Sequence, residues 1–478
     1  MAAPTNAPSS KDEEVWKDDD FLSLDMSDDK GKEAKAATAA TSDSSSSKKA
    51  QESTAATAVG TALRAGRRSG PSAQSPTLPP PPPPLLPSQP PWVGTMPAVD
   101  SRRFHPVTVL HNEIVGFTQL MQPRPHEIAQ RAALVRAVEA LVHETFVGEA
   151  YQVQVFGSQA TGLFLPTSDI DLVVQTGAAA AAAGDATKTN KNGSPAENKE
   201  AEVVDDLEKD WNVPSGTPLE RLATALRERW IAKLSYLEVI ANTRVPLVKF
   251  CVDGIQVDVC FDQGTGPPAA ALMKTYLTAL PPLRPLTFVL KYFLAARGLN
   301  EPYSGGVGSF MLQLMLVGFL QQRERDAVNY RRPAVNNLGC MLLEFLELFG
   351  LQFNYCTTGI SVRHDGFFFP KGADDRKQVF WQPSRPFAMA MENPLDPTAD
   401  VGKPSFRIGM VQRAFAVAYR LLLAHTVPPL ETTADGSILA TILPPTEEMR
   451  QRAAKNLKRI TNESANGAQE LQSKRRKR

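Results

Sequence analysis

Residues 152–174 read QVQVFGSQATGLFLPTSDIDLVV, and this stretch decides the fold of the chain. Its pattern predicts a strand of alternating apolar and polar residues, a turn at Gly157 and Ser158, a short helix, and a second strand that contains Asp169 and Asp171. Residues two apart on a strand point the same way, so the two carboxylates project together from one face. Two carboxylates aimed at one point favour a hard cation between them, Mg²⁺ or Mn²⁺, with substrate phosphates as further ligands.

The turn between these strands is typical of a phosphate site. Gly157 would let a substrate approach the backbone, and the Ser158 hydroxyl with the N–H groups at the start of the helix would bind terminal phosphates. Taken alone, an Asp-x-Asp pair also fits a solvated strand end, and a Gly-Ser pair fits a plain turn. Their combination at this spacing favours a site for a metal-bound triphosphate.

A third carboxylate is expected from a β-hairpin at Val245–Phe261. Asp253 and Gly254 form its turn, and the alternation that follows places Asp258 on the polar face of the second strand. Asp258 would complete a site for two metal ions, one at an attacking hydroxyl and the other at a leaving pyrophosphate. Asp253 belongs to the turn and Asp262 ends the strand, so we expect structural roles for both.

These motifs resemble the signature of the DNA polymerase β-like nucleotidyltransferases, carried here by Gly157–Ser158, Asp169–Ile170–Asp171 and Val257–Asp258–Val259. The stretches LFLPTSDIDLVV (163–174) and LGCMLLEFLELFGLQFNY (338–355) resemble the nuclear poly(A) RNA polymerases of the TRAMP type. The similarity runs from about His111 to Tyr419. It implies an α+β fold, in which a catalytic domain with a mixed sheet is joined to a helical central, PAP-associated domain.

Composition and resemblance together divide the chain. The first hundred residues are rich in Ala, Ser, Lys, Asp and Pro, with too little large apolar surface to offset chain entropy. The capping pattern Thr217-x-x-Glu220 predicts a helix start after a polar insertion. The predicted segments are a disordered arm at 1–103, N-terminal helices at 104–147 that pack on the central domain, the catalytic domain at 148–262 with a disordered insertion at 177–216, the central domain at 263–430, and a disordered polar, basic tail at 445–478.

The resemblance also implies nucleotide contacts. Gly266 falls where a cleft glycine touches the nucleotide, Lys291 matches a triphosphate lysine, and Ser309–Phe310 matches a Ser–Tyr pair that binds phosphate and stacks on the base. The nucleotide-recognition loop resembles residues 392–403, with Lys403 at a usual Arg and Ala399 at a usual Asn. From the residues alone, the lysine at 291 also fits a surface helix, the phenylalanine a core position, and the lysine at 403 a plain loop charge.

The function implied is transfer of adenylates from ATP to RNA 3′ ends, with two Mg²⁺ or Mn²⁺ ions held by Asp169, Asp171 and Asp258. A uridylyltransferase or mixed-tailing enzyme keeps the same chemistry with another base. An inactive member that serves as a scaffold is a third alternative, although all three aspartates are present. The family further suggests a zinc-knuckle RNA-binding protein and an RNA helicase as partners.

A net charge of +1 gives no bulk attraction for nucleic acid. The four cysteines form no CxxC pair, so we expect reduced thiols. Charged residues 11–14 stand where a secretory signal needs an apolar run, and the longest apolar run, Phe310–Leu320, is too short to span a bilayer, so we expect no membrane partner. The basic cluster Lys474–Arg478 fits a nuclear-import signal, an RNA-binding tail or a solvated charge run. With the resemblance, it predicts a nuclear protein, with the nucleolus as a candidate compartment.

Overall fold

The computed structural model describes residues 90–93, 105–176, 216–243, 245–329, 336–372, 379–426 and 437–459. Most of the predicted arm, almost all of the predicted insertion and the basic cluster of the tail lie outside these ranges. Within them, the mixed α+β architecture predicted from the sequence is confirmed. No helix in the described ranges combines the length and the apolar character needed to cross a bilayer.

A five-stranded mixed sheet has the strand order β1-β2-β5-β4-β3. β2 and β5 pair in parallel, and the other neighbours pair antiparallel. The predicted hairpin is confirmed, because β4 and β5 are joined by Asp253 and Gly254 with φ angles of 52° and 75°, as a tight hairpin turn requires. The strands are β1 (Tyr151–Phe156), β2 (Ile170–Thr176), β3 (Leu234–Ile240), β4 (Leu247–Val252) and β5 (Ile255–Phe261).

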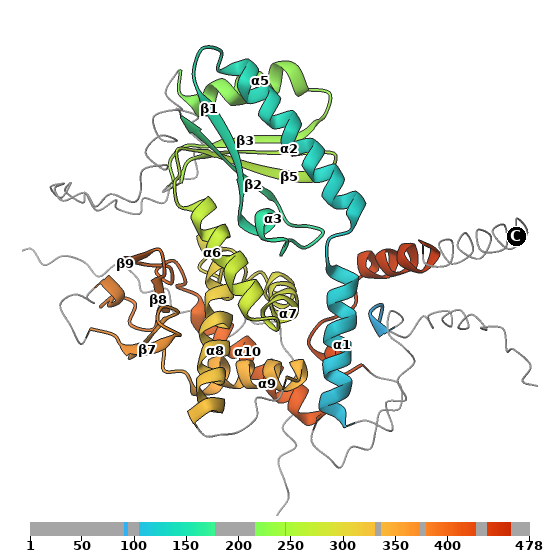
Figure 1. The fold of residues 1–478 in the computed structure, drawn as a ribbon, viewed down its shortest axis with the longest axis vertical. Coiled ribbons are helices and arrows are strands. Elements are labelled where there is room, and N and C mark those ends of the chain that lie inside the picture. The colour runs from blue at the N-terminus through green and yellow to red at the C-terminus, as the bar shows by residue number, and fades with distance from the viewer. Residues whose placement is uncertain are drawn as a thin grey trace, which may run out of the picture. The chain divides into compact units, whose positions relative to one another are not determined.

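Two helices, α2 (Pro125–Thr145) and α5 (Pro218–Trp230), pack against each other and against this sheet (Figure 1). Ile170 and Leu172 of β2 lie in the core beneath them, so Asp171 between them points to the opposite face. The predicted start of α5 is confirmed, since the Thr217 hydroxyl accepts a hydrogen bond from the N–H of Glu220.

The helix α1 (Pro106–Met121) packs on the central helices, but α2 packs on the sheet. The prediction that residues 104–147 pack on the central domain is therefore wrong for α2. The apolar face of a helix shows which side is buried and does not show which surface covers it.

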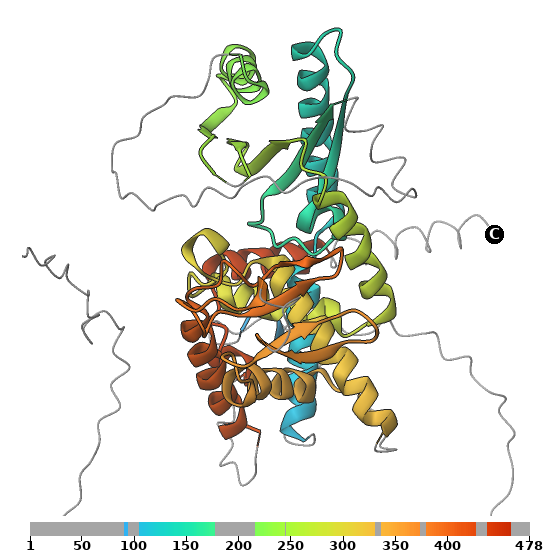
Figure 2. The ribbon, with the colours of Figure 1, turned by 90° about the vertical axis from the view of Figure 1, so that its left-hand side faces the viewer.

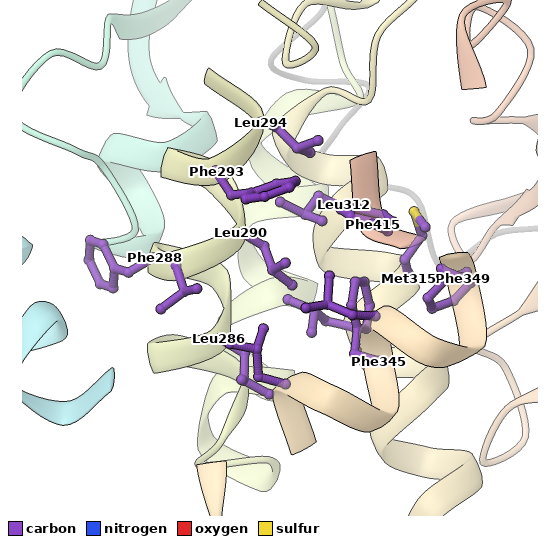
Figure 3. Close-up of a cluster of buried hydrophobic side chains, with 14 of the residues drawn as sticks. Leu286, Phe288, Leu290, Phe293, Leu294, Leu312, Met315, Phe345, Phe349 and Phe415 are labelled. Carbon is purple, nitrogen blue, oxygen red and sulfur yellow. The ribbon is translucent and has the colours of Figure 1, made fainter. Parts of the chain in front are cut away.

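The central helices surround a large apolar core. Within it, Phe345 has ring centroids 4.7 Å from Phe349 and 5.6 Å from Phe415, and Figure 3 shows these rings beside Leu290 and Met315. α1 packs against α7 and α9 (Figures 1 and 2). The elements are α6 (Gly266–Ala279), α7 (Leu283–Ala295), the short helix η4 (Pro302–Ser304), α8 (Ser309–Asn329), α9 (Leu338–Glu347), the π-turn η5 (Leu348–Gln352), α10 (Ile408–Ala424) and η7 (Leu439–Thr441).

A second, four-stranded sheet has the order β7-β6-β8-β9. Its strands are β6 (Thr358–Ser361), β7 (Phe367–Pro370), β8 (Ala390–Asn393) and β9 (Asp396–Asp400). The loop predicted at 392–403 is thus the β8–β9 hairpin and the residues after it. Asp400 fixes its end, because one carboxylate oxygen accepts from the N–H of Met391 at 2.9 Å and of Gly402 at 2.8 Å.

Both ends of the described chain join the central core. Trp92 is fully buried, with its ring 5.5 Å from that of Phe117, so the prediction of a disordered arm up to residue 103 is wrong for residues 90–93. The predicted polar tail is helical over residues 447–459, where Arg452 donates to the carbonyl of Leu120 at 2.6 Å and pairs with Glu127. The composition of these two segments does not reveal that they pack on the core, because a single buried residue anchors each of them.

Candidate active site

The strand register brings two aspartates and a lysine into one row across three neighbouring strands. Asp171 of β2 stands beside Asp258 of β5, which stands opposite Lys249 of β4. Asp169 lies two residues before Asp171 and faces the same way. All four side chains line one cleft of about 1170 Å³. The structure thus brings the three aspartates of the sequence analysis together.

Lys249 bridges two of these carboxylates. Its Nζ lies 3.1 Å from Oδ2 of Asp169 and 3.2 Å from Oδ2 of Asp258. Burial disfavours the ammonium, but the charges of Asp258 and Asp169 outweigh burial and raise the pKa of Lys249 above its ordinary value. The ammonium therefore stands between two carboxylates, where a metal ion would be attracted.

The carboxyl groups of Asp171 and Asp258 lie in a buried setting. Burial, reinforced by the charges of Asp258 and Asp169, raises the pKa of Asp171 to about 7. Burial also raises the pKa of Asp258, against the charge of Lys249. Oδ1 of Asp258 is buried and has no hydrogen-bond partner among the described residues. The neighbours in the cleft thus supply too little positive charge to keep both carboxyl groups fully ionised.

The donor set fits a hard divalent cation. As the side chains lie, no group of three or more His, Cys, Asp or Glu residues in the described ranges is arranged to hold a metal ion. Three carboxylates nevertheless face one cleft, and one of them has an unpartnered buried oxygen. Mg²⁺ takes oxygen ligands and is commonly held by one or two carboxylates with substrate phosphates. Binding an ion here requires Lys249 to release the aspartates.

Gly157 begins α3 (Gly157–Thr161) with a φ of 61°. A Cβ at this position would stand 2.1 Å from Oδ2 of Asp171, so a side chain would displace the carboxylate. The next residue, Ser158, lines the cleft. Gly157 was expected to let substrate approach the backbone. The structure shows that its lack of a side chain also leaves room for the Asp171 carboxylate.

Lys291 reaches the cleft from α7. It is 8% exposed, and its Nζ donates to the carbonyl of Leu163 at 3.1 Å. Arg284, about two helical turns before Lys291, donates to the carbonyl of Gly162 at 2.9 Å. Burial lowers the pKa of Lys291 to about 8, against the opposing charge of Asp171. Lys291 is therefore a buried lysine that faces the carboxylates, and the surface-lysine alternative does not hold.

The first two residues of α8, Ser309 and Phe310, both line the cleft. Phe310 is partly buried and also packs against the core of the central helices. The core role and the cleft role, which were alternatives for this ring, therefore coexist.

Three expected nucleotide contacts, Gly157, Gly266 and Lys403, are not among the residues that line the cleft. Gly266 begins α6, and a Cβ there would stand 2.6 Å from the ring of Phe156, so close packing explains this glycine. Lys403 is exposed, and the neighbours that line the cleft are Val401 and Pro404. The resemblance places residues along the chain and does not fix which way their side chains and backbone face.

Four further residues that line the cleft were not foreseen from the sequence: Lys249, Glu301, Tyr236 and Tyr303. A signal existed for Lys249, since the hairpin turn pairs it directly with Asp258. Burial, reinforced by the charge of Asp169, raises the pKa of Glu301. Glu301 and the two tyrosines reach the cleft only through tertiary packing, for which the local sequence has no signal.

Two stretches of the chain match models of known families. Residues 110–278 match "Poly(A) RNA polymerase, mitochondrial-like, central palm domain", and residues 337–399 match "Cid1 family poly A polymerase". The first contains the five-stranded sheet with the three aspartates, and the second contains α9 and the second sheet up to β9.

A solved structure described as "Structure and function of the polymerase core of TRAMP, a RNA surveillance complex" is similar to this chain. The TM-score is 0.57 at 28% sequence identity, and the match covers 74% of this chain and 99% of that chain. The likeness therefore extends through almost the whole of that core.

Relatives of the chain carry poly(A) RNA polymerase names. It is 34% identical over 322 residues to "Poly(A) RNA polymerase CID14" of Cryptococcus neoformans, covering 66% of this chain and 36% of that protein. It is 30% identical over 361 residues to "Poly(A) RNA polymerase cid14" of Schizosaccharomyces pombe, covering 73% and 47%. The chain thus spans less than half of the length of these two relatives.

A third relative is covered more fully. The chain is 31% identical over 339 residues to "Inactive non-canonical poly(A) RNA polymerase protein Trf4-2" of Drosophila melanogaster, covering 70% of this chain and 73% of that protein. The chain therefore belongs to the family of poly(A) RNA polymerases that includes Cid14 and Trf4-2.

Proposed function

We propose that the protein adds nucleotides, chiefly adenylates from ATP, to the 3′ end of RNA without a template. The observation that carries this proposal is the convergence of Asp169, Asp171 and Asp258 on one cleft that also holds Lys249 and Lys291. The names of the relatives support adenylate as the nucleotide.

The aspartates would hold Mg²⁺ or Mn²⁺, with Lys249 turned aside. When bound, two such ions supply activation of the attacking hydroxyl and charge neutralisation at the leaving pyrophosphate. Support comes from the donor chemistry and from the unpartnered Oδ1 of Asp258. Removal of divalent ions with a chelator should abolish nucleotide transfer.

In the proposed reaction, the RNA 3′ oxygen forms a bond to the α-phosphorus of ATP, and the bond from that phosphorus to the bridging oxygen of the β-phosphate breaks. Pyrophosphate is the leaving group. Asp258 would take the hydroxyl proton. The Lys291 ammonium and the hydroxyls of Ser158 and Ser309 line the same cleft and would bind the triphosphate, while Phe310 would offer its ring to the base.

Base choice is the part of the proposal that the site residues constrain least. Ala399 stands where the resemblance expects an Asn that reads the base, and Phe310 lacks the hydroxyl of the expected Tyr. Primer extension of one RNA with ATP, UTP, GTP and CTP in turn, in Mg²⁺ or Mn²⁺, tests the choice. Extension with ATP alone or far above the others supports the proposal, and preferential use of UTP supports a uridylyltransferase.

The same assay tests the scaffold alternative. One relative is named inactive, so family membership by itself does not establish activity. The three aspartates and the paired Lys249 favour an active enzyme. No extension with any nucleotide, by a folded protein in either ion, would support a scaffold.

We also propose a nuclear role in RNA processing, surveillance and decay, with a zinc-knuckle RNA-binding protein and an RNA helicase as partners. The likeness to a polymerase core of an RNA surveillance complex supports this. The net charge of +1 supports the need for an RNA-binding partner, because a near-neutral chain offers few contacts to RNA phosphates. The isolated chain should extend an unstructured RNA poorly, and the zinc-knuckle partner should raise kcat/KM by lowering KM for RNA. Efficient tailing by the lone chain at physiological salt would contradict this dependence.

A further inference from the structure

Three aromatic side chains line the cleft, and the proposed function uses only Phe310. Tyr236 of β3 is 45% exposed and donates its hydroxyl to Glu238. Tyr303 of η4 is 85% exposed, the highest value for a large apolar or aromatic side chain in the described ranges. No described residue makes a hydrogen bond or ring contact with it. Isolated exposed rings are common on protein surfaces, but this one lines the cleft that holds the aspartates.

The turn that carries Tyr303 is fixed on both sides. The N–H of Gly306 donates to the carbonyl of Glu301 at 2.9 Å, and the N–H of Val307 donates to that of Leu299 at 2.8 Å. The N–H of Arg407 donates to the carbonyl of Gly305 at 2.9 Å and ties the turn to the start of α10. A ring held out by a fixed backbone loses little entropy when a flat partner binds it.

Tyr303 is also close in the chain to the reacting groups. Two residues before it, Glu301 lies near enough to Asp169 for their charges to interact. On the other side, Ser309 and Phe310 begin α8 in the same cleft. A substrate strand whose 3′ end enters this cleft to reach the aspartates comes into the space that Tyr303 and Tyr236 line.

The charge of the cleft favours stacking over phosphate contacts as the means of holding that strand. Among the side chains that line the cleft, five are carboxylates and two are lysines: Asp169, Asp171, Glu238, Asp258 and Glu301, against Lys249 and Lys291. Metal ions held by the three aspartates would neutralise those carboxylates, and the remaining two glutamates and two lysines leave no net positive wall to attract an RNA backbone. Aromatic rings hold single-stranded nucleic acid through the faces of its bases, which are uncharged.

We propose that Tyr303 stacks on a base near the 3′ end of the acceptor RNA and so holds that end in the cleft. This assignment rests on the proposed function, because it takes RNA as the acceptor. It is distinct from the nucleotide site, where Phe310 is the ring. Stacking on RNA would explain why the Tyr303 ring is exposed, which packing within the protein does not explain.

The first test measures binding without catalysis. A 5′-labelled single-stranded oligoadenylate is titrated with the protein by fluorescence anisotropy in the absence of nucleotide, at several salt concentrations. Tyr303→Ala should weaken binding by about tenfold, the loss expected for one base on one ring, without changing the salt dependence. Tyr303→Phe should bind like the wild type. Trp381→Ala is the matched control, because Trp381 is 40% exposed and does not line the cleft.

The second test identifies the base. Oligoadenylates with an abasic site at each of the last three positions in turn are titrated against the wild type and Tyr303→Ala. At one position, loss of the base should weaken wild-type binding and leave the variant unaffected. Additive losses at every position, or equal binding of RNA by the wild type and the folded variant, would overturn the assignment.

Steady-state assays separate this site from the nucleotide site. With Tyr303→Ala, KM for RNA should rise about tenfold while KM for ATP stays within about twofold. A rise in KM for ATP alone would overturn the proposal by assigning the ring to the nucleotide. If the wild type transfers no nucleotide, the proposed function fails, whereas the binding and abasic tests still decide whether Tyr303 holds RNA.

Discussion

Lys249 and Asp258 stand opposite each other on antiparallel strands, with Nζ of the lysine 3.2 Å from Oδ2 of the aspartate. The same Nζ lies 3.1 Å from Oδ2 of Asp169. One ammonium thus neutralises part of a carboxylate cluster and competes with any cation drawn to it. Metal affinity and the position of this lysine should therefore be coupled.

Replacing Lys249 by methionine should strengthen binding of Mn²⁺ by the free protein. The thioether keeps the length of the chain and removes the competing charge. Two unit charges 4 Å apart interact by about 4 kcal/mol near a protein surface. Removal of the lysine charge is therefore more than sufficient to raise the Mn²⁺ affinity about tenfold. Isothermal titration calorimetry measures the affinity. Lys274→Met, an exposed position on α6, is the control and should leave it unchanged. Equal Mn²⁺ affinities in the wild type and Lys249→Met would contradict the coupling.

Phe310→Leu should raise KM for ATP about tenfold with a smaller effect on kcat, because a stacked base is held equally in the ground and transition states. Leucine keeps apolar volume where Phe310 meets the core and loses the flat ring. Steady-state kinetics at saturating RNA check the split, with thermal melting as the control for folding. An unchanged KM together with a lowered melting temperature would leave Phe310 with a core role only.

Trp92→Ala should lower the free energy of unfolding by about 3 to 5 kcal/mol, since a fully buried ring leaves a cavity. Deletion of residues 1–88, which keeps this anchor, should leave both stability and activity unchanged. Deletion of residues 1–103 should lower stability. Urea denaturation followed by circular dichroism measures the stability of Trp92→Ala and of the two deletion variants. Equal midpoints for the two deletions would show that Trp92 contributes nothing to the core.

Asp400→Asn should change the pH dependence of stability. Burial raises the pKa of Asp400 to about 6, against the hydrogen bonds from Met391 and Gly402. Between about pH 4 and pH 6, the folded state therefore keeps a proton on Asp400 that the unfolded state has released. The contribution of Asp400 to stability is fully present below about pH 4 and falls as the pH rises to about 6. The wild-type unfolding free energy, relative to the variant, should fall by up to about 3 kcal/mol across that window. A constant difference between pH 4 and pH 7 would contradict the raised pKa.

The strands that carry the aspartates could be predicted from the sequence because their signals are local. The hairpin turn at Asp253–Gly254 fixes the register of Asp258, and the period of two separates Asp171 from the buried Ile170. These features need no knowledge of the rest of the chain.

Other features could not be predicted because they depend on distant partners. The α2 helix shows an apolar face in the sequence, but the sheet that covers this face is formed by later residues. Trp92 lies in a proline-rich stretch and becomes a core residue only when Phe117 is beside it. The cleft position of Tyr303 likewise follows from the packing of the turn against the start of α10.

The most direct measurement of the central proposal compares Asp258→Asn with Asp253→Asn in primer extension with ATP and Mg²⁺ or Mn²⁺. Asp258 faces the cleft, whereas Asp253 sits in the hairpin turn of the same strands with a φ of 52°, which asparagine tolerates. We expect Asp258→Asn to lose adenylate addition by on the order of 10³ or more, about 4 kcal/mol of barrier, while remaining folded. Asp253→Asn should retain it. Near wild-type tailing by a folded Asp258→Asn protein would contradict the three-carboxylate site and the function proposed from it.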